Sequence, residues 1–169
     1  MDAILTAATD LFAERGPAAT SVRDIAARAD VNHGLVYRHF GAKEDLVAAA
    51  LNQLSDSLQQ CFDDGAPQEE IEALADRHLR VVARTILDGY PVGRMQRNFP
   101  FVSDLVERAR AHLPGETEAR LAAGHTAALE LGWRLFEPFI RTAAGLESVT
   151  LEDLHEAVRE RGVRLLRER

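Results

Sequence analysis

Hydrogen-bond donors gather in one short stretch of the sequence, "VNHGLVYRHFGAK", which runs from residue 31 to residue 43. Tyrosine, arginine and lysine side chains donate to phosphate oxygens, and histidine reaches a base edge or the phosphate backbone. Gly34, in the same stretch, lets such a group approach the peptide backbone closely. The donors are His33, Tyr37, Arg38, His39 and Lys43. These residue types, so closely spaced, predict a contact with nucleic acid.

Catalytic and metal-binding patterns are missing from the sequence. It has no nucleophile elbow, phosphate-binding loop or paired-carboxylate motif, which disfavours an all-α enzyme. Cys61 is the only cysteine, so no internal disulfide and no cysteine-based zinc site is expected. His33 and His39 are six residues apart, a spacing that does not bring helical metal ligands together. We expect no metal, no cofactor and no catalytic residue.

The charge of the chain is unevenly distributed. Its net charge at pH 7 is −7 with histidine neutral, which opposes a polyanionic partner at long range. Residues 20–43 nevertheless carry four cations against two carboxylates, a net charge of +2, so the remainder carries −9. A short basic segment in an acidic chain indicates a local contact with an anion.

Three short helices are predicted to position the donors. Gly16, followed by a proline, ends the first. Ser21 and Asp24 have the spacing of a capping box, so the second begins there. Asn32 is expected to cap a third helix that starts at His33. The apolar positions of the three helices are Ile4, Ala8, Leu11 and Phe12, then Ile25, Ala26 and Ala29, then Val36 and Phe40.

The third helix would turn its donors outward, because Val36 and Phe40 are four residues apart and face one core. His33, Gly34 and Tyr37 are left mostly outside, together with Arg38 and His39. Two short helices joined by a tight turn, the second of which exposes donors, are the parts of a helix-turn-helix.

The segment "TSVRDIAARADVNHGLVYRHFGAKEDL" resembles the DNA-binding signature of the TetR family of bacterial transcriptional regulators. The resemblance covers residues 1–47 and rests on spacing, capping and the aromatic pair together. It implies a double-stranded operator, palindromic because the reader would be a two-fold dimer. With the cations of the basic segment added, the predicted DNA-contacting residues are Thr20, Ser21, Arg23, His33, Gly34, Leu35, Tyr37, Arg38, His39 and Lys43.

Three features depart from the family pattern. Asp30 stands where a glycine is common, so we expect slight strain in the turn. Leu35 replaces a frequent threonine and would offer an apolar contact, such as one to a thymine methyl. The sequence begins almost at the first helix, without the basic arm of many relatives, so contacts in the minor groove are not expected.

The rest of the chain keeps a helical period, which predicts an all-α protein. Further helices are expected over residues 43–62, 69–88, 102–112 and 116–144 and from residue 151, with Pro91 and Pro100 breaking the segment between the second and third of these. We expect a helix-turn-helix domain over residues 1–47 and a helical effector-binding and dimerisation domain over residues 48–169. No apolar run is long enough for a membrane span and no secretory signal is present, so a cytoplasmic protein without a membrane partner is expected.

The two C-terminal helices have more apolar surface than one buried face requires. Helices with spare apolar surface and small residues pair with their own copies, and in the resembled family the last two helices usually form a four-helix dimer interface. The chain itself, as a homodimer, is therefore an expected partner. The predicted interface residues are Leu121, Ala128, Gly132, Leu135, Phe139, Leu151, Leu154, Val158, Gly162 and Leu165.

Aromatic residues and histidines on apolar faces could line a cavity in the distal part of the chain. They are His78, Tyr90, Met95, Phe99, Phe101, His125, Leu129, Trp133 and Phe136. Each is equally explained as an ordinary core residue, whereas the resemblance implies a pocket for an unidentified small-molecule effector. The function expected from the resemblance is a repressor that its ligand releases from DNA. A TetR-like interaction module or coactivator without DNA binding is the alternative.

Overall fold

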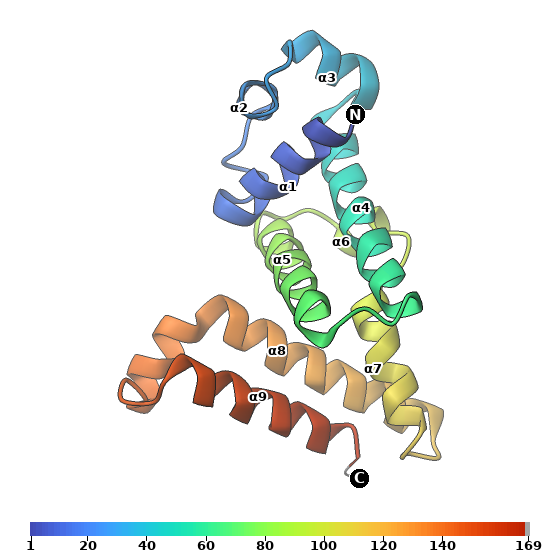
Figure 1. Cartoon of the computed structure of the whole chain (residues 1–169), viewed down its shortest axis with the longest axis vertical. Coiled ribbons are helices and arrows are strands. Elements are labelled where there is room, and N and C mark those ends of the chain that lie inside the picture. The colour runs from blue at the N-terminus through green and yellow to red at the C-terminus, as the bar shows by residue number, and fades with distance from the viewer. Residues whose placement is uncertain (168–169) are drawn as a thin grey trace. The chain divides into compact units, whose positions relative to one another are not determined.

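Helices make up the structure of this chain, a computed structural model that describes residues 1–167 (Figure 1). No strand occurs within this range, so the predicted all-α class is confirmed. Two compact units are present, one over Met1–Phe99 and one that begins at Pro100. The helices are α1 (Asp2–Arg15), α2 (Val22–Arg28), α3 (His33–Phe40), α4 (Lys43–Asp63), α5 (Gln68–Leu87), α6 (Val92–Met95), α7 (Pro100–Arg110), α8 (Glu116–Ala144) and α9 (Leu151–Leu165).

The first unit has one core, to which α1 to α5 all contribute. Phe12 of α1, Ile25 of α2 and Val47 of α4 are completely buried in it, and Val36 of α3 is 1% exposed. The boundary expected at residue 47 therefore lies inside a continuous helix and beside a shared core. Because α4 and α5 pack directly against α1, compactness divides the chain after Phe99.

Helix α5 is hydrogen-bonded to α1 and to the loop between α1 and α2. The Arg77 guanidinium donates to Thr9 Oγ1 at 2.7 Å and to Asp10 Oδ1 at 2.5 Å. At the C-terminal end of α5, Asp88 Oδ2 accepts a hydrogen bond of 2.6 Å from the Ala18 backbone amide. We call these three bonds the α5 anchor. Because the Arg77 and Asp10 side chains are both partly exposed, solvent screens their attraction. The anchor therefore acts mainly by holding α5 in place against α1 and the loop after it.

The second unit packs α7 and α9 against α8, and alanines form most of the contact face of α8. The buried residues of α8 are Ala119, Ala122, Ala123, Thr126 and Ala127. These small side chains allow a close approach, and a Cβ at Gly162 of α9 would lie 3.2 Å from Thr126 Cγ2. The α8 bounds equal the predicted ones, and Gly145 ends the helix with a left-handed φ of 68°.

No helix among the described residues combines the length and the apolar character needed to cross a bilayer.

Candidate nucleic-acid interface

Helix α2 begins at the predicted capping box. Ser21 Oγ accepts from the Asp24 amide at 3.1 Å, and the Ser21 amide donates to Asp24 Oδ2 at 2.9 Å. The backbone hydrogen bond from Ser21 is the main reason why the pKa of the Asp24 carboxyl lies below its usual value, and Arg15, at 2.9 Å, lowers it further. These bonds satisfy amides that the first helical turn leaves open, so the start of α2 is fixed.

The turn from α2 to α3 is a Schellman motif with Asp30 in its left-handed position. The Val31 amide donates to the Ala26 carbonyl at 2.9 Å and the Asp30 amide to the Ala27 carbonyl at 3.3 Å. Asp30 has a φ of 53°, which other non-glycine residues of the described chain do not share. The left-handed backbone on which the expected strain depends is therefore present at this residue, a region that L-residues adopt at a cost.

Helix α3 presents its donors to solvent, as predicted. Asn32 caps it, with the Gly34 amide donating to Asn32 Oδ1 at 2.8 Å. Tyr37 is 54% exposed, whereas Val36 beside it is buried, so the polar face points away from the core. The other exposed residues of this helix are His33, Gly34, Arg38 and His39. We call this exposed surface of α3, with Lys43 at the start of α4, the reading face.

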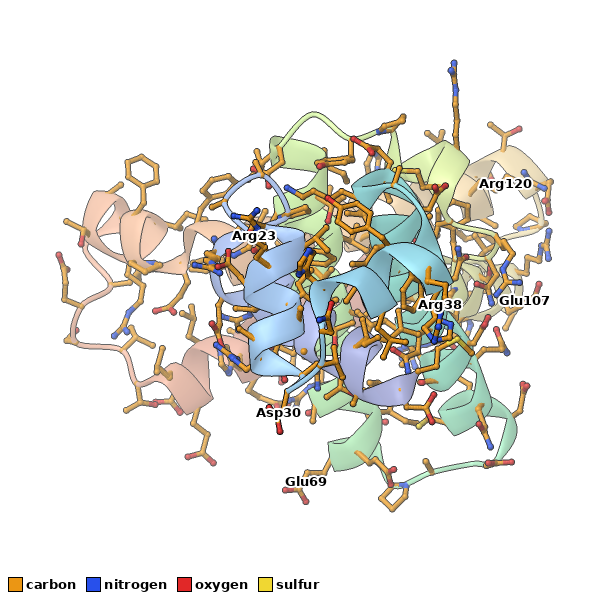
Figure 2. The ribbon with its side chains drawn as sticks, turned by 90° about the horizontal axis from the view of Figure 1, so that it is seen from above. Arg23, Asp30, Arg38, Glu69, Glu107 and Arg120 are labelled. Carbon is orange, nitrogen blue, oxygen red and sulfur yellow. The ribbon has the colours of Figure 1, made fainter. Side chains whose placement is uncertain are left out.

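Three cations of the basic segment, two on the reading face and one on α2, form no ion pair with the residues that the structure describes. Among the described residues, Arg23, Arg38 and Lys43 form no ion pair, and Figure 2 shows Arg23 and Arg38 projecting from α2 and α3. Arg28, the fourth cation of the basic segment, instead makes two hydrogen bonds to Glu14, at 3.0 Å and 3.1 Å. This pair lowers the pKa of Glu14 and raises that of Arg28. The three unpaired cations could therefore bind a polyanion without first breaking an existing ion pair.

Two predicted contact residues are partly or wholly turned inward. Thr20 is 1% exposed, and its hydroxyl donates to the Gly16 carbonyl at 2.8 Å, so it holds the α1–α2 loop. Leu35 is half-buried, which leaves part of its side chain for an apolar contact. Ser21 is exposed, although its oxygen already caps α2.

Asp88 was not among the predicted site residues, yet its hydrogen bond to the Ala18 amide positions the loop that leads into α2. A Cβ on Gly16 would lie 2.7 Å from Asp88 Oδ2, and Gly16 has a φ of 82°, so this approach requires glycine. Asp88 and its partner Ala18 are 70 residues apart in sequence. No local spacing signals such a contact.

The residues predicted to line an effector pocket are divided between the two units. His78, Tyr90, Met95 and Phe99 belong to the first, where Tyr90 and Met95 pack against the core and Phe99 is exposed. The five in the second unit include the half-buried Phe101, Leu129 and Trp133 and the exposed His125 and Phe136. His125 is exposed because the buried face of α8, which is made mostly of alanines, lies on another side of the helix.

His78 joins a buried polar cluster with two residues that were not predicted. Gln96 Nε2 lies 2.5 Å from Ser55 Oγ and 3.0 Å from His78 Nε2, and Ser55 Oγ lies 3.3 Å from the same ring nitrogen. The side chains of His78 and Gln96 are 3% and 6% exposed. Burial lowers the pKa of His78 to about 4, so the ring is neutral at pH 7.

The residues predicted for a dimer interface differ in how far they are exposed to solvent. Leu154, Val158 and Gly162 are buried within the chain, and Gly132, Leu135 and Leu165 are half-buried. The exposed residues of the set are Leu121, Ala128, Phe139 and Leu151. Phe139, 72% exposed, is a large apolar side chain that the chain itself does not cover.

Known proteins resemble the chain along nearly its whole length. The family model "Bacterial regulatory proteins, tetR family" matches residues 4–50, which contain α2, the turn and α3. The HTH-type transcriptional repressor Rv3405c of Mycobacterium tuberculosis and the HTH-type transcriptional regulator Mb3439c of Mycobacterium bovis are each 52% identical over 164 residues, 97% of this chain and 87% of theirs. The HTH-type transcriptional repressor KstR2 of Mycolicibacterium smegmatis is 38% identical over 94 residues, which cover 48% of this chain and 46% of that protein. The helix-turn-helix geometry and these relatives agree, and the chain belongs to the TetR family of bacterial transcriptional regulators, which are not enzymes.

Proposed function

We propose that this regulator is a homodimeric, cytoplasmic repressor that binds a palindromic operator and leaves it when a small-molecule effector binds. The observation that carries the proposal is the reading face, which sets exposed donors on α3 beside unpaired cations. Relatives with 52% and 38% identity are named repressors, which supports this sign of regulation.

Two kinds of contact are assigned to the reading face. Tyr37, Arg38 and Lys43 donate to phosphates and set the position of α3 on the duplex, with Arg23 supporting them from α2. His33, at the N-terminal end of α3, reads base edges, because a recognition helix enters the major groove with its N-terminal residues. Leu35 offers its exposed part to a thymine methyl.

The exposed apolar residues of α8 and α9 support assembly into a dimer. Leu121, Phe139 and Leu151 are large apolar side chains left in solvent by a single chain. A two-fold dimer would place two copies of α3 about 34 to 36 Å apart, or at a multiple of that distance, along the operator.

Release by an effector requires a structural connection between the bound ligand and the reading face. Contacts of α5 support such a connection. His78 and Arg77 are adjacent on α5, the first in the buried polar cluster and the second in the α5 anchor. Ser55 brings α4, which begins at the reading face, into the same cluster. A ligand that displaces α4 or α5 would thus disfavour the state that fits the operator.

The test of DNA binding is the effect of salt and of single substitutions on operator affinity, with the operator obtained by selection from genomic fragments. Tyr37→Phe and Lys43→Gln should weaken binding to every sequence, and Lys43→Gln should reduce the salt slope by about 0.9 for each phosphate that the lysine neutralises. His33→Ala should change the preferred bases instead. Arg164→Gln, which removes one exposed charge in the second unit, is the control and should leave the slope unchanged. An affinity that does not depend on salt would instead favour the alternative, an interaction module without DNA binding.

A further inference from the structure

The buried polar cluster, Ser55, His78 and Gln96, has too few partners for its hydrogen-bonding atoms. The Ser55 hydroxyl donates to the Leu51 carbonyl at 3.0 Å, so its oxygen is left to accept from the Gln96 amide group. The second amide proton of Gln96 goes to His78 Nε2, which places the proton of the neutral ring on Nδ1. That Nδ1–H and Gln96 Oε1 are both buried and both without a partner.

The unsatisfied pair does not depend on how the Gln96 amide is turned. Rotating the amide by half a turn makes its oxygen the acceptor for His78 Nε2–H, so the free groups become the two amide N–H and an unprotonated Nδ1. At least one donor and one acceptor stay unpaired in either arrangement. Buried polar groups nearly always have partners, and each exception calls for a bound molecule or another explanation.

We propose that the buried polar cluster anchors a small neutral ligand whose polar group donates and accepts hydrogen bonds at once, as a primary carboxamide does. The proposal rests on the proposed function, because it assigns a chemistry to the effector. A molecule of this kind offers both an acceptor for the free donor and a donor for the free acceptor, whereas a carboxylate offers only acceptors and an ammonium group only donors.

The charges around the cluster also favour a neutral ligand. Burial keeps His78 uncharged at pH 7, so the ring supplies no positive charge to a carboxylate. The cation next to Gln96 in sequence, Arg97, is exposed and already pairs with Asp56 at 2.9 Å. A charged group placed at the cluster would therefore lose its hydration without gaining a counter-charge from His78 or Arg97.

The experiment uses three matched series of probes and the full-length protein labelled with nitrogen-15 histidine. The probes are acetamide, butyramide and hexanamide, the carboxylates of the same chain lengths, and the corresponding primary amines. The ring nitrogens of His78 report binding at the cluster, and those of the exposed His112 serve as the internal control. Amides should shift the His78 Nδ1 signal in a saturable way, while acids and amines should leave it unchanged.

Substitutions provide a second measurement. Gln96→Met keeps the side-chain length but removes the carboxamide, including the free acceptor and the donors to Ser55 and His78, so amide affinity should fall by about tenfold. His112→Gln should leave the affinity as it is. The inference is overturned if no amide shifts His78, or if acids, amines and amides shift it equally. Because the wild-type signal is read directly, this result does not depend on whether Gln96→Met folds.

Operator release, measured on the same samples, separates this inference from the proposed function. Amide binding at His78 without release would support the ligand chemistry and count against control by this ligand. A natural effector that releases the operator while the His78 signals stay fixed would preserve the proposed function and overturn the inference. The linkage between the two equilibria is reciprocal, so a true effector must bind less tightly to the protein–operator complex.

Discussion

Asp30 holds the left-handed position of the helix-turn-helix with a charged and exposed side chain. Asparagine tolerates this backbone region well and carries no charge. Asp30→Asn should therefore raise the affinity for all DNA sequences, because it removes a carboxylate from the neighbourhood of the reading face. Fluorescence anisotropy with operator and with unrelated DNA checks this, and both affinities should rise by a similar factor.

A matched control for Asp30→Asn is Asp63→Asn, which removes the same charge from the C-terminal end of α4. Equal gains for the two variants would show that only the net charge matters. Asp30→Gly tests the backbone separately, since relief of strain is offset by a more flexible unfolded chain, leaving a change of about 1 kcal/mol or less in the free energy of unfolding.

His78 makes the stability of the first unit depend on pH. Its pKa is about 4 in the folded chain and close to its usual 6.5 when unfolded, so the unfolded state binds the proton first as pH falls. The free energy of unfolding should thus be highest above pH 6.5 and should decrease from there toward pH 4. Between pH 7.5 and pH 5 the loss from this residue should be about 2 kcal/mol.

Urea unfolding at these two pH values checks the dependence on His78. His78→Gln should abolish most of the decrease, whatever its effect on stability at neutral pH. His112→Gln, at an exposed histidine, should keep the wild-type dependence. If the decrease persists in His78→Gln, the ring is not the group that titrates.

At the scale of elements, the α5 anchor joins α5 to α1 and to the loop between α1 and α2 by side-chain hydrogen bonds. Asp88→Ala removes the acceptor for the Ala18 amide, so the unfolding free energy should fall by about 1 kcal/mol. The α1–α2 loop would then be less fixed, and operator affinity should fall severalfold. Asp63→Ala controls for the change in negative charge, which by itself would strengthen DNA binding. An Asp88→Ala variant with unchanged operator affinity would show that the anchor does not position the reading face.

Sequence patterns predicted the elements that short-range chemistry determines. The capping box at Ser21, the cap at Asn32 and the outward face of α3 each depend on residues within a few positions, and all three are present. The bounds of α8 and the start of α9 followed from apolar periodicity and from the turn residues between the helices.

The sequence did not reveal the contacts that depend on how the loops and helices pack. The resemblance implied that Thr20 contacts DNA, yet its hydroxyl donates to the Gly16 carbonyl, four residues earlier. His125 and Trp133 were placed on an apolar face of α8, but alanines near Ala122 make the close contact, because small side chains allow helices to approach. Of the buried polar cluster only His78 was predicted, since Ser55 and Gln96 are polar residues of a kind usually found at the surface.

At the scale of the whole molecule, dimerisation is tested at an exposed residue that the fold does not need. Phe139→Glu should convert the dimer to monomer, because a carboxylate buried without a partner at an interface costs several kcal/mol. Leu154 is unsuitable for this test, since its burial against α8 would make Leu154→Glu unfold the unit itself. Sedimentation equilibrium measures the outcome, with Val102→Glu on α7 as the control. A dimer that survives Phe139→Glu would place the interface elsewhere.

The sequence contains a single lysine, and that lysine is Lys43 at the reading face. Reagents that acylate amines will therefore modify this protein at one side chain, Lys43 at the reading face, and otherwise only at the N-terminal amine. Amine coupling to a sensor surface would obstruct the operator, so immobilisation is better directed to the second unit. The same chemistry offers a footprint, because bound operator should shield Lys43 from acylation, and the mass of the peptide that contains Lys43 would report the occupancy of the DNA site.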